Sequence, residues 1–262
     1  MEWLVVLALI VVGAPLAAWL AQDSLLFFPQ PIAAIGHLPA NAAPLEIEVA
    51  QGMRLRGWIV PGTSRPGPTV LYFGGNAEEV SWTLSDARWP REWTIVGVNY
   101  RGYGASAGRP GEPALKADAL AIHDAVAHRD DVDPRRIVVF GRSLGTAVAT
   151  HVAAERPRVA AAVLVSPYDS MVAIGRLHYP WLPVALLLRH RFEATSDAAR
   201  SHMPLLAIVG DADAIIPPSR SRALYDAWSG PKQWLAVIGA GHNDLGNDQD
   251  FWRAIGRFLA ER

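Results

Sequence analysis

The chain has 262 residues, of which 24 are basic and 25 acidic, so its net charge is −1, and no stretch gathers lysine and arginine into a basic stripe. Phosphate backbones bind through such stripes, so we expect no nucleic-acid partner. The absence of cysteine excludes a disulfide framework, a thiolate zinc site and a cysteine nucleophile. With 51% hydrophobic residues, the length suffices for one α/β domain of about 230 residues and a short extra segment.

The extra segment is the N-terminus. Residues 3–21 carry no charge, and as a helix they would span about 28 Å, close to the ~30 Å hydrocarbon thickness of a bilayer. Trp3 and Trp19 lie near its two ends, where interfacial tryptophans are expected. A cleaved signal peptide is the competing interpretation, but the segment has an acidic start and no Ala-x-Ala cleavage site. We therefore predict a single-pass membrane anchor at residues 1–24. No basic residue lies near it to indicate which side of the membrane the rest occupies.

Beyond the anchor, apolar runs alternate with helical patterns. Strands are predicted near residues 45–49, 55–60, 69–73, 94–98, 137–140, 161–165, 205–209 and 233–237. Helices are predicted near residues 113–128, 144–155, 219–228 and 249–261. Continuous apolar strands are typical of a sheet covered by helices on both faces, so the predicted fold class is α/β with a mostly parallel, doubly wound sheet. Residues 25–262 show no internal boundary and are predicted to form one domain, with its working loops at the carboxyl ends of the strands.

One serine is placed to be a nucleophile. Ser143 lies in the segment Gly141-Arg142-Ser143-Leu144-Gly145, between a predicted strand and a predicted helix. A strand that reverses sharply into a helix forces the serine into a strained backbone conformation with its hydroxyl exposed, and glycines on either side tolerate the crowding. The pattern alone is weak, and its context of strand, tight turn and helix favours a serine hydrolase.

A serine hydroxyl near neutral pH needs a base to take its proton and an acid to orient that base. His242 is the histidine that follows a predicted strand directly in a glycine-rich loop, so we predict it to be the base. The orienting acid is left open among Asp213 and Asp211, which share an earlier loop, and Asp169, for which a turn or helix-capping role is favoured. The other histidines are expected to have structural, surface or substrate-edge roles: His37, His123, His128, His151, His178, His190 and His202.

An apolar insert separates two of the predicted strands. It covers about residues 170–200 and contains the run Tyr179-Pro180-Trp181-Leu182-Pro183-Val184-Ala185-Leu186-Leu187-Leu188. We predict a small lid over an acyl pocket there, and a packed crossover helix of the core is the competing interpretation.

Five stretches taken together resemble the α/β-hydrolase superfamily. They are Tyr72-Phe73-Gly74-Gly75-Asn76-Ala77, Asn99-Tyr100-Arg101-Gly102-Tyr103-Gly104, the serine segment, Gly210-x-x-Asp213-x-x-x-Pro217 and Gly241-His242-Asn243-Asp244. More narrowly, the chain is similar to the membrane-anchored branch that includes eukaryotic lysophospholipases and protein depalmitoylases. The resemblance implies that Ser143 is the nucleophile, Asp213 the acid and His242 the base, with the backbone N–H groups of Asn76 and Leu144 forming the oxyanion hole.

Two positions depart from the pattern of the relatives. Many relatives have His-Gly where this chain has Gly74-Gly75, and many have Asp where Asn99 stands. Neither departure removes a member of the triad that the resemblance implies.

The expected reaction is acyl transfer to water through an acyl-enzyme, with no metal and no organic cofactor. An apolar insert beside a membrane anchor favours a lipid-like ester or thioester as the substrate. The alternatives are a peptidase of the same fold and a catalytically inactive, membrane-tethered binding module.

Overall fold

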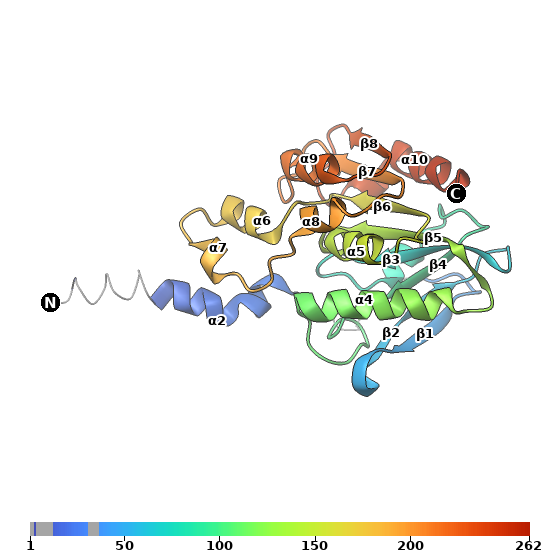
Figure 1. Ribbon diagram of the computed structural model, residues 1–262, viewed down its shortest axis with the longest axis horizontal. Coiled ribbons are helices and arrows are strands. Elements are labelled where there is room, and N and C mark those ends of the chain that lie inside the picture. The colour runs from blue at the N-terminus through green and yellow to red at the C-terminus, as the bar shows by residue number, and fades with distance from the viewer. Residues whose placement is uncertain (1–2, 4–12, 31–36) are drawn as a thin grey trace.

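The computed structural model describes Trp3, residues 13–30 and residues 37–262. Its centre is an eight-stranded sheet in the order β1-β2-β4-β3-β5-β6-β7-β8 (Figure 1). The strands are β1 (Ala43–Glu48), β2 (Arg54–Val60), β3 (Gly67–Phe73), β4 (Thr94–Val98), β5 (Val132–Arg142), β6 (Ala161–Val165), β7 (Leu205–Gly210) and β8 (Lys232–Val237). Neighbouring strands from β4 to β8 are parallel, whereas β1 and β2 are antiparallel additions at one edge. The predicted α/β class with a mostly parallel sheet is confirmed.

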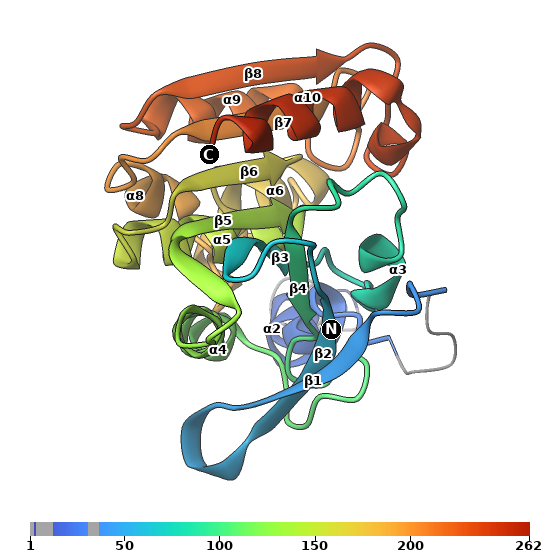
Figure 2. The same cartoon turned by 90° about the vertical axis from the view of Figure 1, so that its right-hand side faces the viewer.

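Helices cover both faces of the sheet (Figure 2). One face packs against α4 (Glu112–Ala127), α5 (Leu144–Glu155), α8 (Ala194–Ala198) and α9 (Pro218–Ala227). The other face packs against α3 (Ser81–Leu84) and α10 (Gln249–Ala260). A short turn, η3 (Leu245–Asn247), precedes α10. Alternate residues of one strand divide between the two cores: Leu71 and Phe73 lie in the first, Val70 and Tyr72 in the second.

The predicted strands and the four predicted helices are present, with ends that differ by a few residues. The largest difference is in β5, predicted at residues 137–140 but beginning at Val132. β5 begins at Val132 because this residue pairs with Gly67 of β3. The register then shifts between Gly67 and Thr69, and from Thr69 onward the pairing is regular. A short turn, η2 (Ala50–Gly52), joins β1 and β2.

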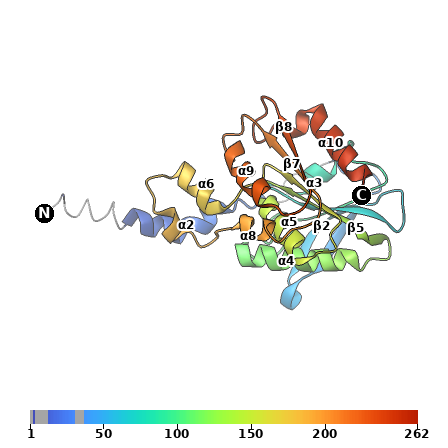
Figure 3. The ribbon, with the colours of Figure 1, turned by 45° about the horizontal axis from the view of Figure 1, so that its top comes forward.

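Three further helices lie together beyond the carboxyl ends of the central strands (Figures 1 and 3). They are α2 (Ala14–Leu26), α6 (Met171–His178) and α7 (Val184–Leu187). Within the part of the chain that the structure describes, no helix is both long and apolar enough to cross a membrane. Much of the predicted anchor at residues 1–24, namely residues 1–2 and 4–12, lies outside the described residues.

The predicted insert at about residues 170–200 has two parts. Its end, α8, buries Ala194 and Ala198 in the core against α5 and is a packed crossover helix. Its beginning, α6 and α7, exposes large apolar side chains, including 50% of Leu177, 70% of Trp181 and 87% of Leu186. The lid role of this part stays a prediction.

Candidate active site

Ser143 lies at a sharp turn between β5 and α5. Its backbone has φ 51° and ψ −118°, a left-handed conformation that is strained for a residue with a side chain. The turn is so tight that a Cβ on Gly141 would lie 2.4 Å from the carbonyl oxygen of Gly145, and a Cβ on Gly145 would lie 2.1 Å from that of Phe73. Both glycines are therefore required by close backbone approach, which is the physical basis of the Gly-x-Ser-x-Gly spacing.

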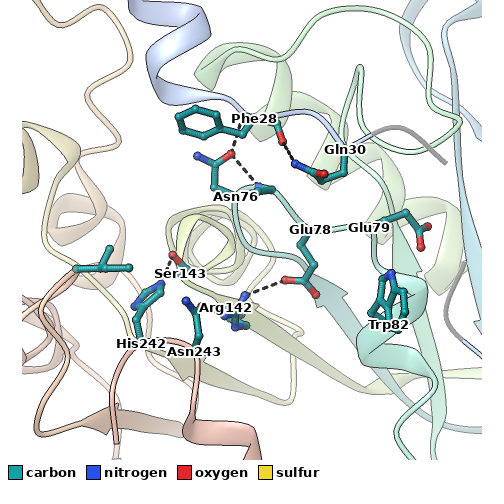
Figure 4. A pocket seen from close by; sticks show the side chains of 12 residues that line it. Phe28, Gln30, Asn76, Glu78, Glu79, Trp82, Arg142, Ser143, His242 and Asn243 are labelled. Carbon is teal, nitrogen blue, oxygen red and sulfur yellow. Dashed lines mark hydrogen bonds and ion pairs between the residues drawn. The ribbon is translucent and has the colours of Figure 1, made fainter. Parts of the chain in front are cut away.

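Three predicted site residues from three separate loops meet at this turn. His242 follows β8, and its Nε2 lies 2.9 Å from the Oγ of Ser143 (Figure 4). Asp213 follows β7, and its Oδ2 lies 2.7 Å from the Nδ1 of His242. The side chains of His242 and Asp213 are 8% and 1% exposed, so the two hydrogen bonds are shielded from bulk water. The arrangement can pass a proton from the hydroxyl to the imidazole while the carboxylate holds the ring in place.

Asp213 is held as a carboxylate by several donors. Its Oδ1 accepts hydrogen bonds from the backbone N–H groups of Ile215, at 2.9 Å, and Ile216, at 2.8 Å. The hydroxyl of Ser166 donates to its Oδ2 at 2.9 Å. Burial by itself raises the pKa of Asp213, but the hydrogen bond from His242 and that from the Ile216 amide outweigh it, so the pKa lies below its ordinary value.

The structure brings neither alternative acid into contact with His242. Asp211 accepts a hydrogen bond from the backbone N–H of Gly239 and is exposed. Asp169 forms an ion pair with Arg220 at 3.0 Å.

Several of the other histidines also have contacts elsewhere. His151 contacts Asp197, His190 contacts Asp23 and the backbone N–H of Glu112, and His178 contacts the carbonyl oxygen of Ile215.

Leu144 and Asn76, whose backbone N–H groups are predicted to form the oxyanion hole, both line a cavity that contains Ser143. Leu144 is the first residue of α5, where N–H groups have no acceptor within the helix. Asn76 lies in the loop after β3 and lines the space around Ser143. Its side chain fixes the loop: Nδ2 donates to the carbonyl oxygen of Leu26 at 2.6 Å, while Oδ1 accepts from the Tyr103 hydroxyl at 2.6 Å and from the Phe28 N–H at 3.0 Å.

A polar network beneath this loop was not found by sequence reasoning. Glu78 accepts hydrogen bonds from the N–H of Gly75 at 2.7 Å, the hydroxyl of Tyr72 at 2.6 Å and the guanidinium of Arg142 at 3.3 Å. Burial first, and then the Glu78 carboxylate, raise the pKa of Tyr72, so its hydroxyl keeps its proton and donates. The position of Arg142 between the glycine and the nucleophile is the one sequence signal that could have pointed to this network.

Ser166 was also missed. It adopts φ 50° at the carboxyl end of β6, between β5 and β7 in the sheet, and this position brings it to Asp213. Strand order in the sheet decides that contact, and the sequence near Ser166 carries no sign of it.

Two cavities of different character meet at Ser143. One, of about 460 Å³, is lined mainly by apolar side chains from α2, α6 and α7, with Ser143, Leu144 and Asn76 also lining it. The other, of about 650 Å³, is more polar and includes Glu78, Glu79 and Arg142 (Figure 4). The site can therefore accept a molecule whose apolar part lies on one side of the serine and whose polar part lies on the other.

One group among the described residues has the composition of a metal site: His151 and Glu155 on α5 with Asp197 on α8. Arg200 already forms ion pairs with Glu155 at 2.8 Å and Asp197 at 2.5 Å. Because an arginine supplies positive charge to both carboxylates, the group is explained as an ion-pair cluster that joins α5 and α8.

Comparisons with known proteins agree with this architecture. A profile of the family described as "alpha/beta hydrolase fold" matches residues 68–192. The uncharacterized protein Rv2307c of Mycobacterium tuberculosis (strain H37Rv) is 39% identical, over 98% of this chain and 93% of its own. The Arabidopsis thaliana alpha/beta hydrolase domain-containing protein WAV2 is 28% identical, over 81% of this chain and 77% of its own. The solved structure of an acetyl xylan esterase from Paenibacillus sp. R4 has a TM-score of 0.70 at 21% identity, covering 87% of this chain and 86% of its own.

Proposed function

Because this chain belongs to the α/β-hydrolase superfamily, we propose that it is a serine hydrolase that cleaves carboxylic ester or thioester bonds. The observation that carries the proposal is the continuous hydrogen-bonded series from Asp213 through His242 to Ser143, with the serine at a strained turn. Similarity to solved esterases, among them those from Paenibacillus and Pyrococcus furiosus, supports ester hydrolysis in general terms.

The proposed reaction has two halves. The Oγ of Ser143 attacks the carbonyl carbon while Nε2 of His242 takes the hydroxyl proton, and the N–H groups of Leu144 and Asn76 donate to the oxygen that becomes negative. The protonated His242 then gives that proton to the leaving alcohol or thiol as the bond to the acyl group breaks. Water repeats the attack on the acyl-enzyme, His242 takes its proton, and the carboxylic acid leaves as the proton returns to Ser143. Asp213 keeps the imidazole in the tautomer whose Nε2 accepts.

The two cavities support a proposal for the substrate class. An apolar acyl group fits the cavity lined by α2, α6 and α7, and a polar leaving group fits the cavity that contains Arg142 and Glu78. We therefore propose a lipid-like substrate with an apolar acyl chain and a polar alcohol or thiol part.

The proposed function is tested by comparing wild type with Ser143→Ala on p-nitrophenyl esters of graded chain length and by labelling with a fluorophosphonate. Ser196→Ala is a matched control, because its exposed hydroxyl donates only to the carbonyl oxygen of Glu193 in the same turn. We expect Ser143→Ala to lose both labelling and turnover and Ser196→Ala to keep both. Equal labelling of wild type and Ser143→Ala would rule the proposal out. Preferential cleavage of peptides would instead indicate a peptidase, and no turnover on either panel a binding module.

We also propose that residues 1–24 attach the protein to a membrane. The uncharged run at residues 3–21 supports the proposal, as do the exposed apolar side chains of α2, of which 53% of Leu16 and 65% of Leu20 are accessible. Deleting residues 1–24 should release the protein from membranes. Release of the full chain by alkaline carbonate would contradict a membrane span.

A further inference from the structure

The N-terminal helix α2 is fixed to the catalytic domain by specific polar contacts at its C-terminal end. Gln22 is 5% exposed although it lies on a short helix at the surface. Its Nε2 donates to the carbonyl oxygen of Leu187 at 3.2 Å, and its Oε1 accepts from the backbone N–H of Arg189 at 2.7 Å. Leu187 is the last residue of α7 and Arg189 follows it, so the side chain of Gln22 joins α2 to the C-terminal end of α7.

Neighbouring contacts also hold α2 in this position. Asp23 forms an ion pair with Arg189 at 2.9 Å, and its Oδ1 accepts a hydrogen bond from the Nε2 of His190 at 3.0 Å. Phe27, where the helix ends, is 3% exposed and packs edge-on against His190 with ring centroids 5.1 Å apart. The ring of Phe27 and the hydrogen-bonded amide of Gln22 are both buried, and each can be buried in this way in only one arrangement. The helix α2 therefore has a defined position against the domain.

In that position α2 closes one side of the apolar cavity that reaches Ser143. Ala18, Gln22, Leu25 and Leu26 of α2 line it, opposite residues of α6 and α7. From Ala18 to Leu26 the helix rises about 12 Å, so this wall extends well away from the nucleophile. Figures 1 and 3 both place α2 alongside α6 and α7. Without α2, the side of the cavity opposite α6 and α7 would be open to solvent.

The same segment also reaches the proposed oxyanion hole. The carbonyl oxygen of Leu26 accepts from the Nδ2 of Asn76 at 2.6 Å, and the N–H of Phe28 donates to its Oδ1 at 3.0 Å. The chain that leaves α2 therefore holds the loop that contains Asn76, whose backbone N–H is one of the two proposed oxyanion donors.

We propose that α2 is a wall of the acyl-binding site and that Ala18 sets the length of acyl chain the site accepts. This inference rests on the proposed function and names the part of the substrate that the helix contacts. The occupant is an acyl chain because the cavity is apolar and Ser143 lies in its lining, where the carbonyl carbon of an ester must be placed for attack.

The test is the chain-length profile of full-length Ala18→Phe, measured as kcat/KM on p-nitrophenyl acetate, butyrate, octanoate and palmitate in detergent. Ala17→Phe is the matched control, because Ala17 is the exposed neighbour on the same helix and does not line the cavity. Each methylene excluded from the cavity lowers kcat/KM about fourfold, so a ring that displaces about three methylenes lowers the octanoate-to-acetate ratio on the order of a hundredfold.

The outcomes separate this inference from the proposed function. A selective loss of long-chain turnover in Ala18→Phe, with acetate hydrolysis kept and Ala17→Phe like wild type, supports the wall. An unchanged ratio in a folded Ala18→Phe overturns the wall and leaves the hydrolase proposal intact. Absence of Ser143-dependent hydrolysis in wild type overturns both. Should Ala18→Phe fail to fold, Gln22→Ala replaces it, since losing the contacts to Leu187 and Arg189 must reduce the same ratio.

Discussion

Replacing Asp213 by Asn tests the proposed role of this carboxylate with almost no change in volume. The Oδ1 of Asp213 accepts from the N–H groups of Ile215 and Ile216, and Oδ2 faces His242. In Asp213→Asn the amide oxygen stays on the two backbone donors, so the NH₂ group faces the imidazole. Nδ1 must then accept, the ring proton moves to Nε2, and Nε2 can no longer take the proton of Ser143.

The size of the effect follows from the alternative orientation. Turning the amide round would restore the acceptor to His242 but leave the buried N–H of Ile216 and the partly buried N–H of Ile215 unpaired, at about 1–3 kcal/mol each. The productive tautomer is thus disfavoured by about 2–6 kcal/mol, which corresponds to a loss of about 30-fold to 10⁴-fold in kcat/KM. The assay is hydrolysis of a p-nitrophenyl ester, with circular dichroism to establish that the variant is folded.

Two matched variants make the result decisive. Asp211→Asn and Asp169→Asn change the carboxylates that the structure places away from His242, and we expect each folded variant to keep kcat/KM within a few-fold of wild type. A large loss in either one, with Asp213→Asn active, would refute the reasoning.

Asp213 also makes stability depend on pH. The pKa of Asp213 is lower in the folded chain than its ordinary value of 3.8. A lowered carboxyl pKa means that its stabilisation is fully present above pH 3.8 and is lost as the pH falls through the folded value. The free energy of unfolding of wild type should therefore fall more steeply than that of Asp213→Asn below pH 3.8, as measured by denaturant titration.

Two further predictions concern the turn and the buried polar groups. Gly145→Ala should reduce the free energy of unfolding by about 3 kcal/mol or more, because the new methyl group would collide with the backbone. Gly256→Ala is the control: it lies inside α10, where a methyl group meets no neighbour, and should raise the free energy of unfolding by ~0.8 kcal/mol. Thermal or denaturant unfolding measures both. In wild type, Asn99 donates a hydrogen bond to the buried Glu79 at 2.8 Å, so Asn99→Asp would place two carboxylates against each other and should destabilise the fold at neutral pH. The stability of this variant should recover in acid, where one of the two carboxyl groups is protonated. Equal free energies of unfolding of Asn99→Asp at pH 7 and pH 5 would contradict this prediction.

Much of the site could be predicted because its signals are local. The glycines beside Ser143 are required by backbone approach within a few residues, and the apolar strand and amphipathic helix around them have their own periods. The proposed base was likewise indicated by its place in a loop directly after a strand. These features depend on windows of about ten residues, so one sequence is enough to predict them.

The sequence by itself determined the α/β class, the strand–turn–helix at Ser143 and the loops that hold Asp213 and His242, because periodicity and turn chemistry are properties of short segments. Only the tertiary structure decided which carboxylate contacts the imidazole, that Ser166 and Glu78 brace the site, and that α2 lines the apolar cavity. Those contacts join segments far apart in the chain, and they depend on the order of strands in the sheet and on side-chain packing across it. No local pattern records that order.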